Sequence, residues 1–152
     1  MLTLALETSG AVGSAAVRLP DGTIVERVFP EGTSHGTGLL PACEALLAET
    51  GHPVRDVDLV AVSLGPGSFT GLRVGVAAAK GLAFGLACEL PGVSTLDVLA
   101  SNAIGLREGS VVPILDARRA HVHAALYSVG PDAIIRQSED LVLPPDRLTA
   151  RL

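Results

Sequence analysis

The chain repeats one of its own segments, and this repeat constrains the fold more than any other feature of the sequence. Residues 6–17, LETSGAVGSAAV, align without gaps with residues 115–126, LDARRAHVHAAL, which places Glu7 opposite Asp116. Each copy then passes a turn that contains Pro, Asp and Gly and continues into a third segment with the character of a strand. Two copies of one three-stranded antiparallel meander predict a duplicated, two-lobed α/β fold.

A first helix is predicted after the first meander. Leu39, Cys43 and Leu46 recur at helical spacing, and Gly51 provides a stop signal. Thr37 is the expected cap, and Pro41 is tolerable if it lies in the first turn.

A buried strand, a glycine-rich loop and a second helix form the next unit. The strand spans residues 59–64 and the helix runs from about residue 72 to 86. In that helix Gly71, Gly75 and Ala79 recur every four residues, although an interior glycine costs about 1 kcal/mol relative to alanine. We infer that another backbone must come very close to this face.

The rest of the chain divides the fold into two lobes. Ser94 and Asp97 resemble a capping box at the start of a third short helix. We expect a complete first lobe over residues 1–104 and a partial second lobe over residues 110–152, in which a helix begins near Asp146.

The loop GPGSFTGLR fails both common phosphate-binding patterns. It lacks the Lys-Ser/Thr of a P-loop and the last glycine of a dinucleotide fingerprint, although its amides could still form an anion nest. In the structural interpretation Ser68 or Thr70 caps the helix, Phe69 packs beneath the loop, and Arg73 braces the loop or reaches a partner. The residues of the motif are Gly65, Pro66, Gly67, Ser68, Phe69, Thr70 and Arg73.

Glu7 and Asp116 are the sharpest chemical candidates. Facing each other across a cleft, paired carboxylates can hold a divalent cation against nucleotide phosphates; the alternative is that each acid binds turn amides. No base-activated nucleophile is indicated. The four histidines lack the spacing of a metal site; they are His35, His52, His121 and His123.

Composition excludes several classes of protein. The net charge of −5 leaves no basic footprint, and the adjacent Arg118 and Arg119 do not make the patch of a protein that binds nucleic acid by itself. Cys43 and Cys88 are predicted to be reduced core residues, which fits the cytoplasm. Without a basic n-region or a long uninterrupted apolar stretch, the chain is expected to be soluble, with no signal peptide and no membrane association.

The sequence resembles the bacterial TsaB family, also called YeaZ. The resemblance is carried by VSLGPGSFTGLRVGVAAAKGLA at 62–83, with LALETS near the start, SHGTGLLP at 34–41, VSTLDVLA at 93–100 and ILDARRAHVHAALY at 114–127. It implies the actin-like, sugar-kinase-like ATPase fold of the ribonuclease H-like class, here with the first lobe complete and the second truncated.

The resemblance also implies a function. It suggests a non-catalytic subunit that binds and activates a TsaD-like threonylcarbamoyltransferase, which modifies the adenosine next to the tRNA anticodon. The implied partners are the TsaD-like paralogue and a TsaE-like ATPase, with tRNA reached only through the complex and a weak homodimer as a further state. ATP and metal are expected on the partners, and no cofactor on this chain.

Helix-to-helix association is the expected mode of partner binding. The first helix would offer Leu39, Cys43 and Leu46, and the second Gly71, Gly75 and Ala79; the same residues could instead pack on the chain's own sheet. Two other functions remain open: an ATP-binding protein or kinase that uses Glu7 and Asp116, and a glycoprotease-like metallopeptidase. Family members usually carry Asp where Glu7 stands, and most extend well past 200 residues.

Overall fold

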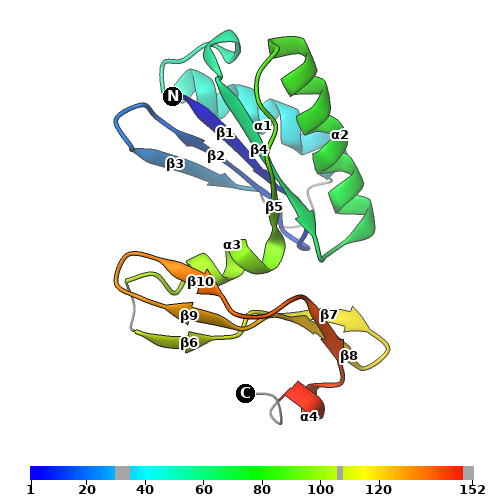
Figure 1. The fold of residues 1–152 in the computed structure, drawn as a ribbon. Coiled ribbons are helices and arrows are strands. Elements are labelled where there is room, and N and C mark those ends of the chain that lie inside the picture. Colours follow the sequence, from blue (N-terminus) through cyan, green and yellow to red (C-terminus); the bar gives the residue numbers. More distant parts are fainter. Residues whose placement is uncertain (30–34, 106–107, 149–152) are drawn as a thin grey trace. The chain divides into compact units, whose positions relative to one another are not determined.

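The computed structural model describes residues 1–29, 35–105 and 108–148, which form two compact units (Figure 1). The first unit is Met1–Val93 and the second is Ser94–Leu152. This division differs from the predicted boundary between residues 104 and 110. The third helix belongs to the second unit because its Leu96 and Ala100 are buried against Ala125 and Tyr127.

The first unit is built on a five-stranded sheet with the order β3-β2-β1-β4-β5. The predicted antiparallel meander is confirmed for β1 to β3, and β4 adds to it in parallel with β1. Alternate residues of β1, β2 and β4 are buried on one face, as expected for a sheet covered on that side. The strands are β1 (Thr3–Glu7), β2 (Ser14–Arg18), β3 (Ile24–Val28), β4 (Leu59–Gly65) and β5 (Gly92–Ser94).

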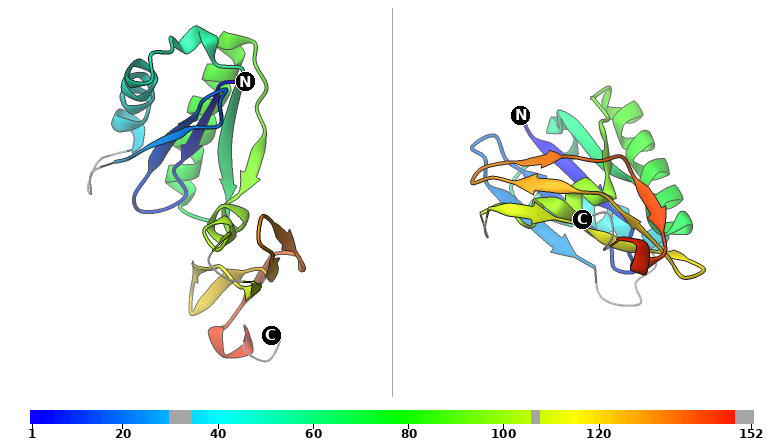
Figure 2. Two further views of the ribbon diagram at one scale, coloured as in Figure 1. Left: turned by 90° about the vertical axis from the view of Figure 1, so that its left-hand side faces the viewer. Right: turned by 60° about the horizontal axis from the view of Figure 1, so that its bottom comes forward.

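Two helices lie side by side on that face and complete the core of the first unit (Figures 1 and 2). They are α1 (His35–Glu49) and α2 (Phe69–Leu86), and a short 3-10 turn, η1 (Val54–Asp56), precedes β4. The core contains Leu4, Leu6 and Val17 from the strands, together with residues of both helices.

The start of α1 differs from the prediction. The helix begins at His35, so Thr37 lies inside it rather than at its cap, and Pro41 stands in the second turn rather than the first. A proline there removes one backbone hydrogen bond of the helix. Thr37 and Pro41 are both exposed, so this irregularity lies on the side of α1 away from the core.

The glycines of α2 pack directly on the turn that follows β1. A Cβ atom at Gly71 would lie 2.0 Å from the backbone oxygen of Thr8, and one at Gly75 would lie 2.1 Å from the Oγ1 atom of Thr8. The predicted close backbone is therefore present, and it is part of the same chain. Gly81, on the exposed side of α2, has nothing within 4 Å of its Cβ position.

We predict that Gly71→Ala lowers the free energy of unfolding by about 1–3 kcal/mol, because the new methyl group overlaps a backbone atom. Gly81→Ala is the matched control, and we expect it to raise stability by about 0.5–1 kcal/mol through helix propensity alone. Urea unfolding measures both.

The two buried glycines should also differ from each other. Thr8→Ala removes the atom that Gly75→Ala would strike but leaves the backbone oxygen that Gly71→Ala would strike. Thr8→Ala should therefore rescue Gly75→Ala in part and Gly71→Ala not at all. Equal effects of alanine at positions 71, 75 and 81 would contradict this packing.

The second unit contains the second meander in interrupted form. Its strands are β6 (Gly109–Val111), β7 (Ile114–Arg118), β8 (His121–Ala124), β9 (Tyr127–Val129), β10 (Ile134–Arg136) and β11 (Leu141–Leu143). They form two short sheets, β10-β9-β6 and β11-β8-β7. The pairs Val111↔Tyr127 and Ile114↔Ala124 share one register, because Ile114 follows Val111 by three residues and Ala124 precedes Tyr127 by three. Thus β6–β7 and β8–β9 act as two long antiparallel strands.

The two meanders are not aligned as the ungapped sequence repeat suggests. In the first, Leu6 pairs with Ala15, whereas its counterpart Leu115 pairs with His123, one residue short of the predicted match at Ala124. A register shift between Asp116 and Arg118 accounts for the difference. One extra residue in a hairpin reverses which side chains of a strand face the core.

The helix α3 (Thr95–Ser101) is tied to the second meander by a polar network. Ser94 caps α3 as predicted, by accepting a hydrogen bond from the Leu96 amide at 3.2 Å. Asp97 does not complete a capping box; it accepts hydrogen bonds from the Tyr127 hydroxyl at 2.5 Å and from Arg136 at 3.2 Å. The short α4 (Pro145–Leu148) begins at the predicted place.

We predict that Tyr127 titrates at unusually high pH. Burial raises the pKa of its phenol above the ordinary 10.0, and the hydrogen bond to Asp97 raises this pKa further. Tyr127 is the one tyrosine of the chain, so the ultraviolet absorbance of the phenolate reports on it alone. The unfolded state loses this proton first, so the free energy of unfolding should fall as pH rises above 10.

The variants Tyr127→Phe and Asp97→Asn test this assignment. Tyr127→Phe should remove that part of the pH dependence, and Asp97→Asn should lower the pKa of Tyr127 in the folded chain. A Tyr127 that ionises at the same pH in the folded and unfolded chains would show that it is not held in this network.

Candidate functional site

The glycine loop between β4 and α2 is fastened to the turn after β1. The Ser68 amide donates a hydrogen bond to the Ser9 carbonyl oxygen at 2.6 Å, and a Cβ at Gly67 would lie 2.5 Å from that oxygen. Gly65 has a φ of +108°, in the left-handed region that favours glycine, and the Gly65–Pro66 peptide bond is cis. The loop glycines therefore serve a tight connection within the chain.

The predicted capping role of this loop is confirmed, and one predicted side-chain position is wrong. The Ser68 hydroxyl accepts a hydrogen bond from the Gly71 amide at 3.3 Å, so Ser68 is the cap of α2. Phe69 does not pack beneath the loop: its side chain is 72% exposed, because the first turn of α2 points it away from the core. The Arg73 guanidinium lies over the Phe69 ring, 5.5 Å from its centre.

Both acids of the repeat are engaged by backbone amides of their own turns. Glu7 accepts hydrogen bonds from the Ser9 amide at 2.5 Å and from the Ser63 hydroxyl. Asp116 accepts one from the Arg118 amide at 2.7 Å. These contacts match the structural alternative given above for strand-end acids. Since Glu7 and Asp116 belong to different units, a shared cation site stays a prediction.

Metal-ligating side chains do not gather at one point in the part of the chain that the structure describes. His121 donates from Nδ1 to the Arg119 carbonyl oxygen at 2.8 Å, inside its own hairpin. The side chain of His35 lies outside the described set.

The six residues predicted to bind a partner are all buried in the first unit. Leu39, Cys43, Leu46 and Ala79 are at most 3% exposed, and Gly71 and Gly75 pack against Thr8. The interface prediction is therefore wrong for these positions, and the alternative of core packing holds. The α1 residues belong to the core of the first unit, and the small-residue face of α2 packs on the turn after β1. Burial raises the pKa of the Cys43 thiol to about 11.

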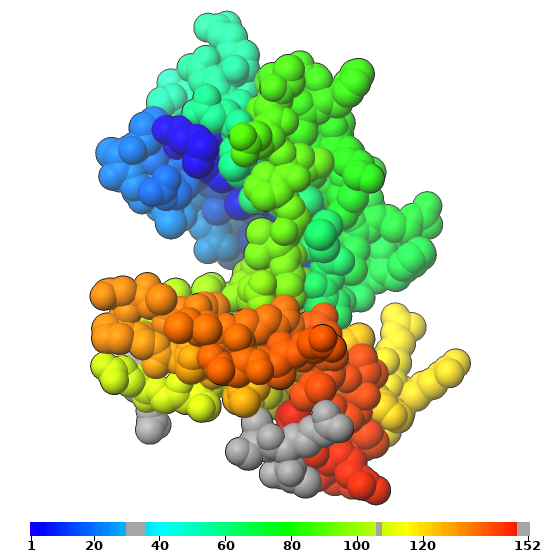
Figure 3. All heavy atoms as spheres, in the orientation of Figure 1, coloured from blue at the N-terminus to red at the C-terminus, as the bar shows by residue number. Residues whose placement is uncertain are grey.

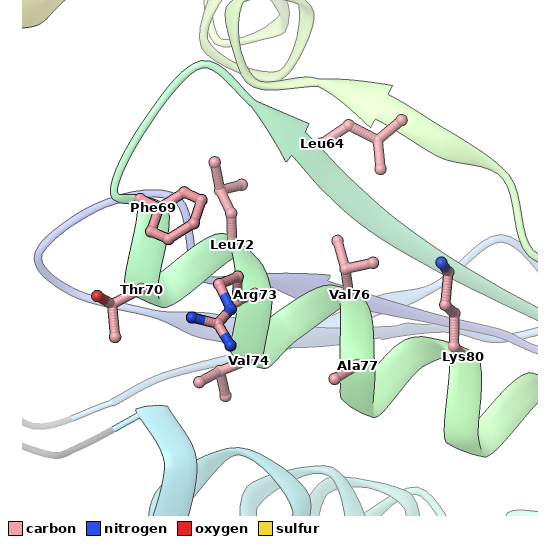
Figure 4. A pocket seen from close by; sticks show the side chains of 9 residues that line it. All are labelled: Leu64, Phe69, Thr70, Leu72, Arg73, Val74, Val76, Ala77 and Lys80. Carbon is pink, nitrogen blue, oxygen red and sulfur yellow. The ribbon is translucent and has the colours of Figure 1, made fainter.

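The opposite side of α2 is exposed and also largely apolar. Figure 4 shows the side chains on this side. This side borders a shallow groove of about 830 Å3 lined by Leu64, Phe69, Thr70, Leu72, Arg73, Val74, Val76, Ala77 and Lys80. In Figure 4, Leu72 and Val76 point toward Leu64, and Val74 points to the other side of the helix. We call these nine residues and Phe84 the α2 surface.

Large apolar side chains dominate this surface. Phe84 is 91% exposed and Leu64 is 59% exposed, in addition to Phe69. Arg73 and Lys80 are the two charged residues of α2. Sequence reasoning missed the surface, although the signal was present: α2 has more apolar residues than one buried face of a helix needs.

The apolar character of α2 also bears on membranes. Within residues 1–29, 35–105 and 108–148, α2 is the one helix whose length and composition would allow it to cross a bilayer. Core helices of soluble proteins meet the same criterion. Here α2 packs along β4 in the first unit.

Comparison with known proteins matches this architecture. A family model described as "TsaD: tRNA N6-adenosine threonylcarbamoyltransferase" covers residues 27–150. The tRNA threonylcarbamoyladenosine biosynthesis protein TsaB of Bacillus subtilis is 36% identical, over 84% of this chain and 55% of that protein. The structure of YeaZ from Pseudomonas aeruginosa superposes with a TM-score of 0.87 at 33% identity, over 95% of this chain and 68% of that chain.

A more distant structure defines the class of fold. The activator of 2-hydroxyisocaproyl-CoA dehydratase from Clostridium difficile superposes with a TM-score of 0.50 at 16% identity. The fold is thus the actin-like α/β fold that the resemblance implied. Within this class, the chain belongs to the TsaB (YeaZ) family. It spans about half the length of the Bacillus relative and about two thirds of the Pseudomonas structure.

Proposed function

We propose that this chain is a non-catalytic subunit that binds and activates a TsaD-like threonylcarbamoyltransferase, and so supports modification of the adenosine next to the tRNA anticodon. The observation that carries the proposal is the exposed apolar α2 surface, in a chain whose relatives are named for tRNA threonylcarbamoyladenosine biosynthesis. The hydrogen bonds of Glu7 and Asp116 to their own turns favour a structural role for both acids.

The α2 surface has the composition of a protein-binding site. Exposed apolar patches on soluble proteins mark surfaces that meet a partner, and aromatic residues are enriched at such interfaces. Phe69 and Phe84 are two of the three phenylalanines in the chain, and both stand exposed on this one helix. The buried face of α2 is held against Thr8, so the outer face is presented on a rigid element.

We predict that Phe84→Glu weakens the complex with the cognate TsaD-like protein at least about tenfold, because an aromatic anchor at the centre of an interface typically contributes 2 kcal/mol or more. Light scattering after size exclusion, on the chain alone and on the mixture, measures the complex and any homodimer. Phe69→Glu should act in the same direction.

Ile24→Glu is the matched control. Ile24 is 65% exposed, but it lies on the edge strand β3, away from the α2 surface. It should leave the complex intact. A wild-type chain that is folded yet forms no complex, or a Phe84→Glu variant that binds as tightly as Ile24→Glu, would argue against this site.

The remaining partners follow from the same proposal. A TsaE-like ATPase would join the complex, ATP and metal would be held by the partner subunits, and tRNA would be bound mainly by the enzyme. The α2 surface would also support a weak homodimer that the TsaD-like protein displaces, since a surface that meets a paralogue can meet itself. The complex would act in the cytoplasm.

ATP binding by this chain is the competing function, and calorimetry separates the two. Under our proposal, titration of ATP with magnesium into the chain gives no saturable heat. Saturable heat that disappears in the double variant Glu7→Ala/Asp116→Ala would instead establish a nucleotide site at these acids. Single variants of each acid would show whether both take part.

A further inference from the structure

The hairpin between β7 and β8 has an unusual backbone. Arg118, Arg119 and Ala120 have φ values of 64°, 51° and 58°, so three successive residues that are not glycine adopt the left-handed conformation. Two hydrogen bonds hold this tip: the Arg118 amide donates to Asp116 at 2.7 Å, and His121 donates to the Arg119 carbonyl oxygen at 2.8 Å. These two hydrogen bonds stabilise the conformation of the turn.

The tip presents two free positive charges. Arg118 and Arg119 are both exposed, and neither guanidinium forms an ion pair within the described part of the chain. By contrast, Arg136 in the same unit is paired with Asp97 and Asp140. In Figures 1 and 3 the hairpin (yellow) projects from the body of the second unit.

We propose that this hairpin tip binds the phosphate backbone of tRNA through Arg118 and Arg119. The inference rests on the proposed function for the identity of the RNA. Adjacent guanidinium groups on a projecting turn can contact successive phosphates of an extended polyanion. A small nucleotide is a poorer fit, because a convex tip cannot enclose it.

The charge of the chain shapes how this contact would act. With a net charge of −5, the chain as a whole repels RNA, so two arginines provide a local contact and not a complete binding site. The hairpin would therefore orient tRNA that the enzyme already holds. Such contacts carry no base specificity, and they weaken with salt.

The test measures binding of a fluorescein-labelled, unmodified tRNA by anisotropy at about 50 to 200 mM salt. Titrations use the chain mixed with its TsaD-like partner and, separately, the chain alone. In the double variant Arg118→Ala/Arg119→Ala, we expect the affinity to fall on the order of tenfold at low salt and the salt slope to fall by about 2. Arg118→Lys/Arg119→Lys should retain most of both.

Arg18→Ala/Arg55→Ala is the matched control. It removes the same amount of positive charge from exposed positions in the first unit, where Arg55 is paired with Asp56, and it should leave the salt slope nearly unchanged. An equal effect of the two double variants, or an unchanged slope at Arg118 and Arg119, would overturn the proposal.

Failure of the complex is a separate result. If the wild-type chain forms no complex with the TsaD-like protein, the proposed function fails, and the hairpin proposal that rests on it fails too. If the complex forms but Arg118→Ala/Arg119→Ala keeps the wild-type salt slope, only the hairpin proposal fails. A third result is also possible. If Arg118→Ala/Arg119→Ala no longer binds the TsaD-like protein, but the salt slope of tRNA binding is unchanged, then the hairpin contacts protein and the RNA assignment is wrong.

Discussion

The contact between α2 and the turn after β1 is the interaction on which the first unit depends. Gly71 and Gly75 bring the helix so near to Thr8 that any β-carbon would overlap its atoms. Gly67 repeats this approach at Ser9, and the Ser68 amide completes it with a hydrogen bond to the same residue. Because these contacts are so close, α2 and the glycine loop cannot shift against the turn after β1 without a steric clash.

This contact also determines what α2 can offer to another molecule. Because the small-residue face of α2 is used internally, its larger side chains lie on the outer face, where Phe69 and Phe84 are exposed beside Leu64 of β4. Glycine in a helix interior is unfavourable, and here the cost is offset by close packing within one chain. The row of small residues on α2 resembles a site for partner contact but packs inside the chain. The partner surface that we propose lies on the opposite side of the helix.

Several elements followed from local patterns alone. The first meander, the apolar strand before Gly65 and the capping serines Ser68 and Ser94 each depend on neighbours in sequence, and each was found where it was expected. The clearest errors arose where contacts with another helix or strand decide the outcome. Asp97 belongs to Tyr127 and Arg136 rather than to a capping box, and one residue in a hairpin shifted the second meander out of the predicted register.

The sequence by itself determined the class of fold and the family, because the repeated meander and the GPGSFTGLR block are properties of the chain's order. It also determined that some backbone must approach Gly71 and Gly75. Only the tertiary structure decided that this backbone is Thr8, that the six predicted interface residues are core, and that α2 exposes its aromatic side. The physical reason is that α2 has apolar residues on more than one side, so periodicity alone does not show which side packs on the sheet. The close fit of Gly71 and Gly75 against Thr8 decides it.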